Sequence, residues 1–405
     1  LAPRSVVNIW SPFDSCPDRD PVRAVKILYI SNVRVPAPIS RSLSVVRLCQ
    51  GLSDCGHDVT LLAYTNDSKA EDPIVYYGLR GGFTVISTVV PDWIHHRILA
   101  KLQITQLILG FLYRQHIQKI DPDLVYSRLT VWELIFVPAD VPIIYEMHSL
   151  SLLRGNFCER WSLNHIVRRR KFKRLIVTTD RLREWLGEIL PDHDIVVARL
   201  SAEEPRQLEQ EELVAFRQTR IEGSFDLNVG YTGFLDRSGY RGIDVLLKIA
   251  DALPEVGVHV IGGLPEIVDY WKKRSLAKNI FFYGFQNPRD MPFYLSCLDI
   301  MLSPLQLEKA SRAPTGKGMG LLKIPEYLSY GACIVASRLP AHEEVLTHNK
   351  NAILVAPDDI DEWVTAINML GSDELTRNAL KANAAHLYWE EMTGSKRVGK
   401  ILSGV

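Results

Sequence analysis

Cysteine is scarce in this sequence, and the few cysteines form no recognisable pair. The chain of 405 residues has six of them, with no CxxC motif and no histidine partner at the spacing of a metal site. A chain of this length has no need of disulfide staples. The pattern favours a reducing compartment, so we expect a cytoplasmic protein. The cysteines are Cys16, Cys49, Cys55, Cys158, Cys297 and Cys333.

An excess of charge and a long apolar run are also missing. Lys plus Arg and Asp plus Glu each number 47, which excludes the basic character of a general nucleic-acid binder. No stretch reaches the roughly 20 consecutive apolar residues of a membrane span. The nearest candidate, residues 94–113, is interrupted by polar and charged residues and is typical of an amphipathic helix. Residues 30–33 lack the GxGxxG turn, which disfavours a dinucleotide-dependent oxidoreductase.

Two series of short apolar strands are present. A chain of 405 residues with 47% hydrophobic composition is expected to form two domains. Strands alternating with helical segments predict two α/β domains, each a Rossmann-like, doubly wound parallel sheet. The strands are expected at residues 26–31, 58–63, 124–126, 142–145 and 175–178, and then at 227–231, 256–261, 280–283, 300–303, 333–336 and 352–355.

The predicted division of the chain follows from a polar stretch between the two series. Ligands of open parallel sheets bind beyond the carboxyl ends of the strands, so function is expected in loops that follow strands and face an interdomain cleft. We interpret residues 1–25 as a leader or cloning remnant, 26–200 as the N-terminal domain, 201–225 as a linker, 226–385 as the C-terminal domain, and 386–405 as a C-terminal helix that returns towards the first domain.

A glycine-rich loop before a helix is the most informative segment. Residues 314–320, Pro-Thr-Gly-Lys-Gly-Met-Gly, precede a helix expected at 322–330. Such a loop presents N–H groups and the positive end of a helix dipole to an anion such as a diphosphate. Lys323 adds a positive charge, and Glu326 can accept hydrogen bonds from two ribose hydroxyls. Alone, the segment is better explained as an ordinary loop and helix, but a second loop and helix start at 337–345 favours the functional interpretation.

Five ordered motifs in the second half of the chain carry a family resemblance. They are YTGFL at 231–235, YRGID at 240–244, VIGG at 260–263, NIFFYG at 279–284 and KIPEY at 323–327. In this order they resemble the C-terminal domain of the retaining GT-B glycosyltransferases of family four, the group-1 glycosyl transferases of polysaccharide and glycolipid assembly. KIPEY is similar to a common variant of the nucleotide-binding helix of that family.

The first half carries three looser matches. GHDV at 56–59, DLVYSR at 123–128 and YEMH at 145–148 are similar to the family patterns GHEV, D-hh-h-S-R and Y-E-x-H. With the C-terminal helix that contains Trp389, the resemblance spans nearly the whole chain from Lys26. It implies a GT-B fold, in which an acceptor-binding domain and a nucleotide-sugar-binding domain face each other across a cleft.

The resemblance also implies an activity. It implies transfer of a sugar from a nucleoside-diphosphate sugar, with UDP favoured over GDP, to a saccharide or lipid-linked saccharide acceptor. Retention of configuration is expected from front-face attack, in which a donor phosphate oxygen takes the acceptor proton. No cofactor and no metal are expected, because lysine, arginine and helix dipoles stabilise the departing diphosphate. The Asp-x-Asp strings at 18–20, 121–123 and 192–194 are interpreted as turns or caps.

Site residues are carried over only where this sequence matches the family. Arg241 is expected at the diphosphate, Glu326 at the ribose and His148 at a donor-sugar hydroxyl. Two departures stand out: Phe234 replaces a family arginine, for which Arg237, Lys317 and Lys323 are open substitutes, and Gly318 replaces a sugar-binding glutamate. The predicted catalytic residues are His148, Arg241 and Lys323. The predicted nucleotide-sugar-binding residues are Gly233, Arg241, Gly262, Gly316, Lys317, Gly318, Gly320, Leu322, Lys323 and Glu326. The predicted acceptor-side residues are Arg34, Ser40, Arg41, Arg128 and Glu146.

Residues 168–174, Arg-Arg-Arg-Lys-Phe-Lys-Arg, form the one concentrated basic run. Two interpretations remain open: contact with an anionic membrane surface or a lipid-diphosphate acceptor, and an ordinary solvated helix face. The amphipathic segment 94–113, with Trp93 at its start, favours peripheral contact with the inner face of a membrane. A nucleotide-sugar epimerase and a non-catalytic sugar-nucleotide-binding protein of the same fold are the alternative functions.

Overall fold

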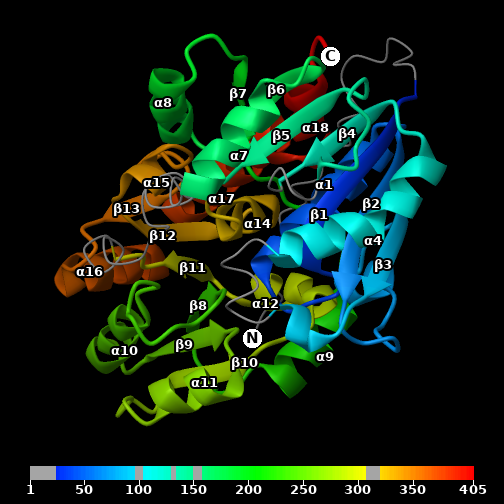
Figure 1. Ribbon diagram of the computed structural model, residues 1–405. Helices are drawn as coiled ribbons and strands as arrows, with labels where there is room; N and C mark the ends of the chain where they lie inside the picture. The colour runs from blue at the N-terminus through cyan, green and yellow to red at the C-terminus, as the bar shows by residue number, and fades with distance from the viewer. Residues whose placement is uncertain (1–23, 96–103, 129–133, 149–156, 307–319) are drawn as a thin grey trace.

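Two parallel β-sheets form the framework of the molecule (Figure 1). The computed structural model describes residues 24–95, 104–128, 134–148, 157–306 and 320–405. The two-domain α/β architecture predicted from the sequence is confirmed. Residues 1–23 of the predicted leader lie outside the described residues. Gly316, Lys317 and Gly318 also lie outside them.

The first sheet has seven strands in the order β3-β2-β1-β4-β5-β6-β7, all parallel. Alternate residues of β1 pack on opposite faces: Leu28 and Ile30 lie against α4 and α7, and Tyr29 lies against α1 and α18. Burial of both faces explains why the strands are continuous apolar runs. The strands are β1 (Lys26–Arg34), β2 (Asp58–Thr65), β3 (Thr84–Val89), β4 (Leu124–Ser127), β5 (Ile143–Met147), β6 (Phe172–Val177) and β7 (Ile195–Val197); the helices are α1 (Ser40–Asp54), α2 (Pro73–Tyr77), η1 (Asp92–His95), α4 (Ile104–Ile120), α7 (Phe157–Val167) and α8 (Asp180–Ile189).

The second sheet has six parallel strands in the order β10-β9-β8-β11-β12-β13. All six overlap the strands predicted for the second half of the chain. The strands are β8 (Leu227–Thr232), β9 (Val256–Ile261), β10 (Ile280–Gly284), β11 (Ile300–Ser303), β12 (Cys333–Ser337) and β13 (Ile353–Val355); the helices are α10 (Ile243–Ala252), α11 (Pro265–Lys272), η2 (Pro288–Asp290), α12 (Met291–Cys297), α14 (Lys323–Ser329), α15 (Pro340–Glu343), α16 (Ile360–Ser372) and α17 (Glu374–Leu387).

The chain crosses between the domains twice. The first crossing leads into helix α9 (Gln210–Arg220), which lies within the predicted linker and stacks Phe216 on Phe293 of the second domain. The second crossing runs through η3 (Tyr388–Met392) into α18 (Gly394–Leu402), which packs against α1 of the first domain. Figure 1 shows this last helix, in red, lying on the N-terminal domain.

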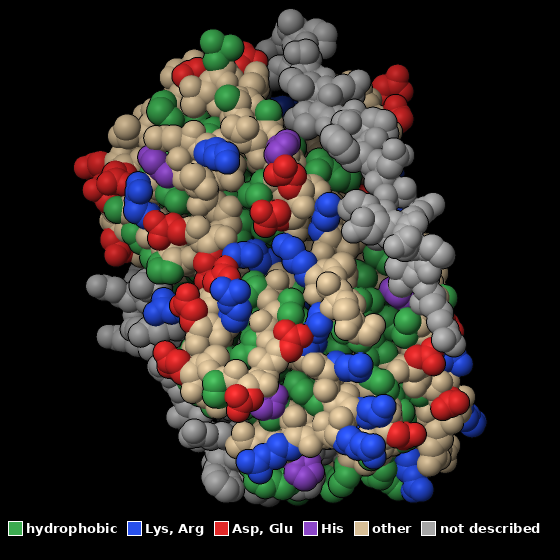
Figure 2. Space-filling view, turned by 90° about the horizontal axis from the view of Figure 1, so that it is seen from above, with side chains coloured by type: hydrophobic (Ala, Val, Ile, Leu, Met, Phe, Trp, Pro, Cys, Tyr) green, Lys and Arg blue, Asp and Glu red, His purple; other side chains and the backbone are tan. Residues whose placement is uncertain are grey.

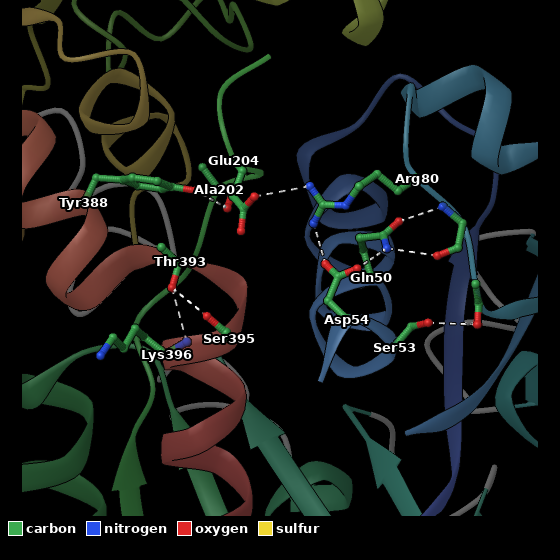
Figure 3. Close-up of polar contacts among 12 residues, drawn as sticks. Gln50, Ser53, Asp54, Arg80, Ala202, Glu204, Tyr388, Thr393, Ser395 and Lys396 are labelled. Carbon is green, nitrogen blue, oxygen red and sulfur yellow. Dashed lines mark hydrogen bonds and ion pairs between the residues drawn. The ribbon is translucent and has the colours of Figure 1, made fainter. Parts of the chain in front are cut away.

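Polar contacts hold the two crossings together (Figure 3). The Tyr388 hydroxyl donates to the Ala202 carbonyl at 3.3 Å, which joins the second crossing to the first. Arg80 of the first domain pairs with Asp54 of α1 at 2.5 Å and with Glu204 at 3.6 Å. The two segments that cross between the domains are therefore held to the first domain by an ion pair as well as by apolar packing.

No helix among the described residues is both long enough and apolar enough to cross a membrane. On the face seen in Figure 2, both cationic and anionic side chains are present.

The turn that leads into α10 has room for glycine alone. Gly242 has a φ of 74°, and a Cβ atom there would lie 1.7 Å from the Pro304 carbonyl oxygen at the end of β11. This close approach fixes the turn that carries Arg241. Gly187 of α8 offers a contrast, because nothing lies within 4 Å of a Cβ built there.

Gly242→Ala is expected to lower the free energy of unfolding by more than about 2 kcal/mol, because it combines left-handed strain with backbone overlap. Gly187→Ala is expected to raise it by roughly 0.5–1 kcal/mol through helix propensity. Chemical denaturation of both variants checks this. Equal stability of the two would show that the turn is not tight.

Candidate functional site

A buried lysine begins helix α14 at the carboxyl edge of the second sheet. Lys323 is 8% exposed, and its Nζ lies 3.8 Å from the centre of the Tyr231 ring. Burial and then the Arg241 guanidinium lower the pKa of Lys323 well below its usual value. An anion beside Lys323 would relieve both effects. This corner of the domain is therefore suited to a negatively charged ligand.

Arg241 supplies the second positive charge of this corner. Its guanidinium carbon lies 5.1 Å from the centre of the Tyr240 ring, and its Nε lies 3.9 Å from an Asp236 carboxylate oxygen. That Nε is buried and has no hydrogen-bond partner in the structure. A guanidinium held so loosely retains donors for an anionic group.

Two glycine turns bring the backbone up to Lys323. A Cβ atom on Gly233, which follows β8, would lie 3.4 Å from Lys323 Nζ. A Cβ atom on Gly262, which follows β9, would lie 2.0 Å from the Gly233 carbonyl oxygen. The structure therefore brings together Gly233, Gly262, Lys323 and Arg241 of the predicted nucleotide-sugar site. Because α14 has seven residues, the two cations rather than a long helix dipole set the local charge.

Glu326, the predicted ribose ligand, pairs with a residue of the other domain. Arg47 of α1 donates from Nη2 to Glu326 Oε1 at 2.5 Å, and both side chains are largely buried. The Nε and Nη1 atoms of Arg47 are buried without hydrogen-bond partners in the structure. Sequence reasoning missed Arg47, although a lone arginine within the apolar run of residues 45–52 was an available signal.

The remaining parts of the predicted loop are only partly described. Gly320 approaches the first domain, since a Cβ atom there would lie 3.1 Å from the Thr178 hydroxyl, just beyond β6. Leu322 is the partly buried residue that precedes α14. Gly320 therefore lies near the carboxyl edge of the first sheet.

His148 lies just beyond β5 and belongs to a buried polar network. Its Nε2 lies 2.5 Å from Glu146 Oε1, and its side chain is 23% exposed. Burial and then Arg128 lower the pKa of His148 to about 4, although Glu146 opposes them. His148 is therefore neutral at physiological pH.

Glu146, which was predicted on the acceptor side, is 2% exposed, and both of its oxygens accept hydrogen bonds within the protein. Oε1 accepts from His148 and from Arg397 of α18, and Oε2 accepts from the Tyr126 hydroxyl. The contacts of Glu146 in the structure are therefore with His148, Arg397 and Tyr126.

The other predicted acceptor-side residues lie at the carboxyl ends of the neighbouring strands β1 and β4. Arg34 donates to Asn66 Oδ1 at 3.4 Å and Arg41 donates to Asn32 Oδ1 at 2.9 Å. Ser40 is the exposed first residue of α1, and Arg128 donates to Ser44 Oγ at 2.9 Å. They share one edge of the sheet with His148, which follows the next strand.

Within the described residues, no group of three or more His, Cys, Asp or Glu side chains could hold a metal ion. Two Asp-x-Asp strings fall in that part of the chain. Asp123 accepts from the Lys26 backbone N–H at 2.9 Å, and Asp194 pairs with Arg174 at 3.0 Å. Both carboxylates thus form structural contacts within the first domain.

Comparison with known proteins places this fold. A search of curated protein sequences finds no match. HepE from Anabaena, solved with UDP and glucose, superposes with a TM-score of 0.66 at 17% identity and covers 94% of this chain and 100% of its own. Sucrose-phosphate synthase from Thermosynechococcus elongatus gives 0.70 at 15% identity, with 93% and 98% covered. A TarM mutant from S. aureus gives 0.68 at 11% identity, with 94% and 99% covered. The fold is of the GT-B type.

Family models extend this likeness from fold to activity. The model described as Glycosyltransferase Family 4 matches residues 42–199, and the model described as Glycosyl transferases group 1 matches residues 226–373. Each domain thus carries a glycosyltransferase signature. The protein is a glycosyltransferase of GT-B type.

The depressed pKa of Lys323 predicts proton uptake on diphosphate binding. An anion raises that pKa, so a nucleoside diphosphate is expected to bind with net proton uptake where Lys323 is partly neutral, and to lose affinity as pH rises. Isothermal titration calorimetry in buffers of different ionisation enthalpy measures the uptake. Lys323→Met is expected to abolish it and Lys248→Met, an exposed lysine of α10, to preserve it. Uptake that persists in Lys323→Met would assign the proton elsewhere.

Proposed function

We propose that this glycosyltransferase moves a sugar from a nucleoside-diphosphate sugar to a saccharide or lipid-linked saccharide acceptor, with retention of configuration and without a metal. The observation that carries the proposal is the convergence of Lys323, Arg241 and Gly233 at the carboxyl edge of the second sheet. Two cations beside a glycine turn fit the two phosphates of a nucleoside diphosphate.

The donor nucleotide is proposed to be UDP in preference to GDP. The likeness to HepE from Anabaena, which was solved with UDP-glucose, supports this choice. The ribose is assigned to Glu326, whose carboxylate can accept from two neighbouring hydroxyls. Because Arg47 pairs with Glu326, donor binding must share or displace that contact.

The donor sugar is assigned to the neighbourhood of His148. With its Nε2–H directed to Glu146, the neutral ring offers Nδ1 as an acceptor for a sugar hydroxyl. The acceptor is assigned to the edge formed by Arg34, Ser40, Arg41 and Arg128.

Transfer is proposed to proceed on one face of the donor. The acceptor oxygen forms a bond to the anomeric carbon as the bond from that carbon to the phosphate oxygen breaks. The acceptor proton passes to a phosphate oxygen of the departing diphosphate, so no protein nucleophile is needed. Lys323 and Arg241 offset the charge that builds on the leaving group, and the cleft orients the two substrates.

Two alternatives share the fold and are separated by their products. An epimerase converts the sugar nucleotide in the absence of an acceptor, and a binding protein leaves it intact. The glycosyltransferase family matches over both domains favour transfer.

A thermal-shift panel of UDP, GDP and ADP tests donor binding. One diphosphate, with UDP expected, should raise the melting temperature by several degrees without added metal. Glu326→Ala should abolish the shift, because the ribose loses its acceptor. Glu255→Ala, an exposed glutamate before β9, should retain it. Arg47→Met should also retain the shift. This variant breaks the ion pair but keeps the Glu326 carboxylate, so it distinguishes the two effects of Glu326→Ala. No shift with any nucleotide would count against the proposal.

We also propose that the first domain contacts an anionic membrane surface. Of the six cations in the basic run, Arg169 donates to the carbonyls of residues 134, 137 and 138, and Arg174 pairs with Asp194. The other four are exposed and form no ion pair within the described part of the chain: Arg168, Arg170, Lys171 and Lys173.

Exposed apolar side chains lie near the basic run at Arg169. A groove of 460 Å³ beside α7 is lined by Ile135, Phe136 and Trp161 and ends at Arg169. Trp161 is 43% exposed and Phe111 of α4 is 61% exposed. Exposed aromatic residues and a basic run in the same part of a domain are typical of surfaces that enter the interface of an anionic bilayer.

Replacing Arg168, Arg170, Lys171 and Lys173 with glutamine is expected to reduce binding to phosphatidylglycerol vesicles roughly ten-fold or more, because each exposed cation near the surface contributes to binding. Co-sedimentation measures this. The matched control replaces four exposed lysines of the second domain, Lys248, Lys272, Lys273 and Lys278, with glutamine and loses the same charge. Equal effects of the two replacements would indicate non-specific attraction.

A further inference from the structure

A charged residue of the last helix lies buried inside the first domain. Arg397 of α18 is 3% exposed, and its Nη2 lies 2.5 Å from Glu146 Oε1 in the middle of the first sheet. The two residues are 251 positions apart in the chain. Burying a guanidinium is costly unless a paired charge compensates for it. The position of Arg397 therefore needs an explanation beyond packing.

The Glu146 carboxylate links Arg397 to His148. Burial alone raises the pKa of Glu146, but Arg397 and then His148 overcome burial and hold that pKa well below its usual value. Ionised Glu146 can only accept hydrogen bonds, so the ring nitrogen that faces it must carry a proton. For a neutral His148 this is the tautomer with the proton on Nε2, which leaves Nδ1 as an acceptor.

We propose that Arg397 is a positioning residue for His148: it holds Glu146 in place as a carboxylate, and Glu146 in turn fixes the orientation and tautomer in which His148 accepts a donor-sugar hydroxyl. This inference rests on the proposed function for the role of His148 in sugar binding. The hydrogen bonds that link Arg397 to Glu146 and Glu146 to His148 do not depend on that role.

The contacts that hold α18 on the first domain fix its position closely enough to determine where Arg397 lies. The Thr393 side chain accepts from the Lys396 backbone N–H and caps the start of the helix (Figure 3). Gly394 packs against Gly51 of α1 so closely that a Cβ atom on Gly51 would lie 3.2 Å from the Gly394 backbone. Near the other end, Arg174 of β6 donates to the Ile401 carbonyl at 3.3 Å. The helix that enters from the second domain thus completes the site of the first.

Three groups besides Arg397 face the Glu146–His148 pair. Tyr29 of β1 and Tyr126 of β4 remain protonated because burial raises the pKa of each. Arg128, beyond β4, adds a positive charge that lowers the pKa of both Glu146 and His148. Loss of Arg397 therefore raises the pKa of Glu146 and of His148 together. Protonation of either destroys the arrangement, so the acid limb of activity moves to higher pH.

The test uses the full-length protein labelled with 15N-histidine. Two-bond 1H–15N spectra report the tautomer and titration of each ring without any substrate, and His148→Gln assigns the signal. The variants are Arg397→Met, which removes the charge, and Arg397→Lys, which keeps it. Arg174→Met is the matched control, because Arg174 also contacts α18 but does not contact Glu146.

The proposal expects the Nε2–H tautomer in the native protein, in Arg397→Lys and in Arg174→Met. In Arg397→Met it expects a mixture of tautomers or a His148 ring that titrates at higher pH. It also expects kcat to fall at least ten-fold, the Kd of the nucleoside diphosphate alone to stay nearly constant, and the acid limb of the pH profile of kcat to move to higher pH. Arg397→Lys should restore most of kcat.

An unchanged tautomer and unchanged pH profile in folded Arg397→Met would overturn the inference, as would equal effects of Arg174→Met. If Arg397→Met does not fold, Glu146→Gln carries the same test. Its side chain is the same size but carries no charge and has an amide that donates as well as accepts, so an unchanged tautomer together with an unchanged titration of His148 would contradict the proposal. Because the spectra need no donor, a failure of the proposed function leaves this result readable.

Discussion

The buried ion pair between Arg397 and Glu146 ties the end of the chain to the centre of the first sheet. Breaking such a pair by removing one partner costs about 3–5 kcal/mol, because the other charge is left buried and uncompensated. The pair therefore fixes where α18 docks, and α18 is the second of the two segments that cross between the domains. Through the same carboxylate it orients His148 at the cleft edge of β5. One interaction thus contributes to the domain arrangement and to the geometry of the site.

Two carboxylates of the second domain contact the first domain directly. Glu326 pairs with Arg47, and Glu344 accepts from the backbone N–H groups of Asp180 and Arg181 at the start of α8. Under the proposed function, the ribose of the donor also uses Glu326, so donor binding is expected to alter the Arg47–Glu326 contact between the domains. A ligand can shift a domain equilibrium only by its differential affinity for the two arrangements.

The sequence predicted what depends on local pattern and missed what depends on distant pairs. Buried parallel strands are apolar runs on both faces, so all six strands of the second sheet could be predicted. The edge strands β3 and β7 were missed, because β3 is partly exposed and β7 has three residues. Arg47 and Arg397 were missed because their partners lie 279 and 251 positions away. The burial of Glu146 could not be predicted either, because a sequence motif does not show burial. Gly233, Arg241 and Lys323 follow strands whose carboxyl ends share one edge, as reasoning from topology expects.

The stereochemistry of the first sugar product tests the central claim most directly. Glycosyltransferases that accept a sugar nucleotide can transfer slowly to water, so hydrolysis of an α-linked UDP-sugar can be followed by 1H NMR without knowledge of the natural acceptor. Front-face transfer predicts that the α-anomer of the free sugar appears first and that the β-anomer grows in later by mutarotation. Initial release of the β-anomer, with the diphosphate leaving from the opposite face, would contradict the account.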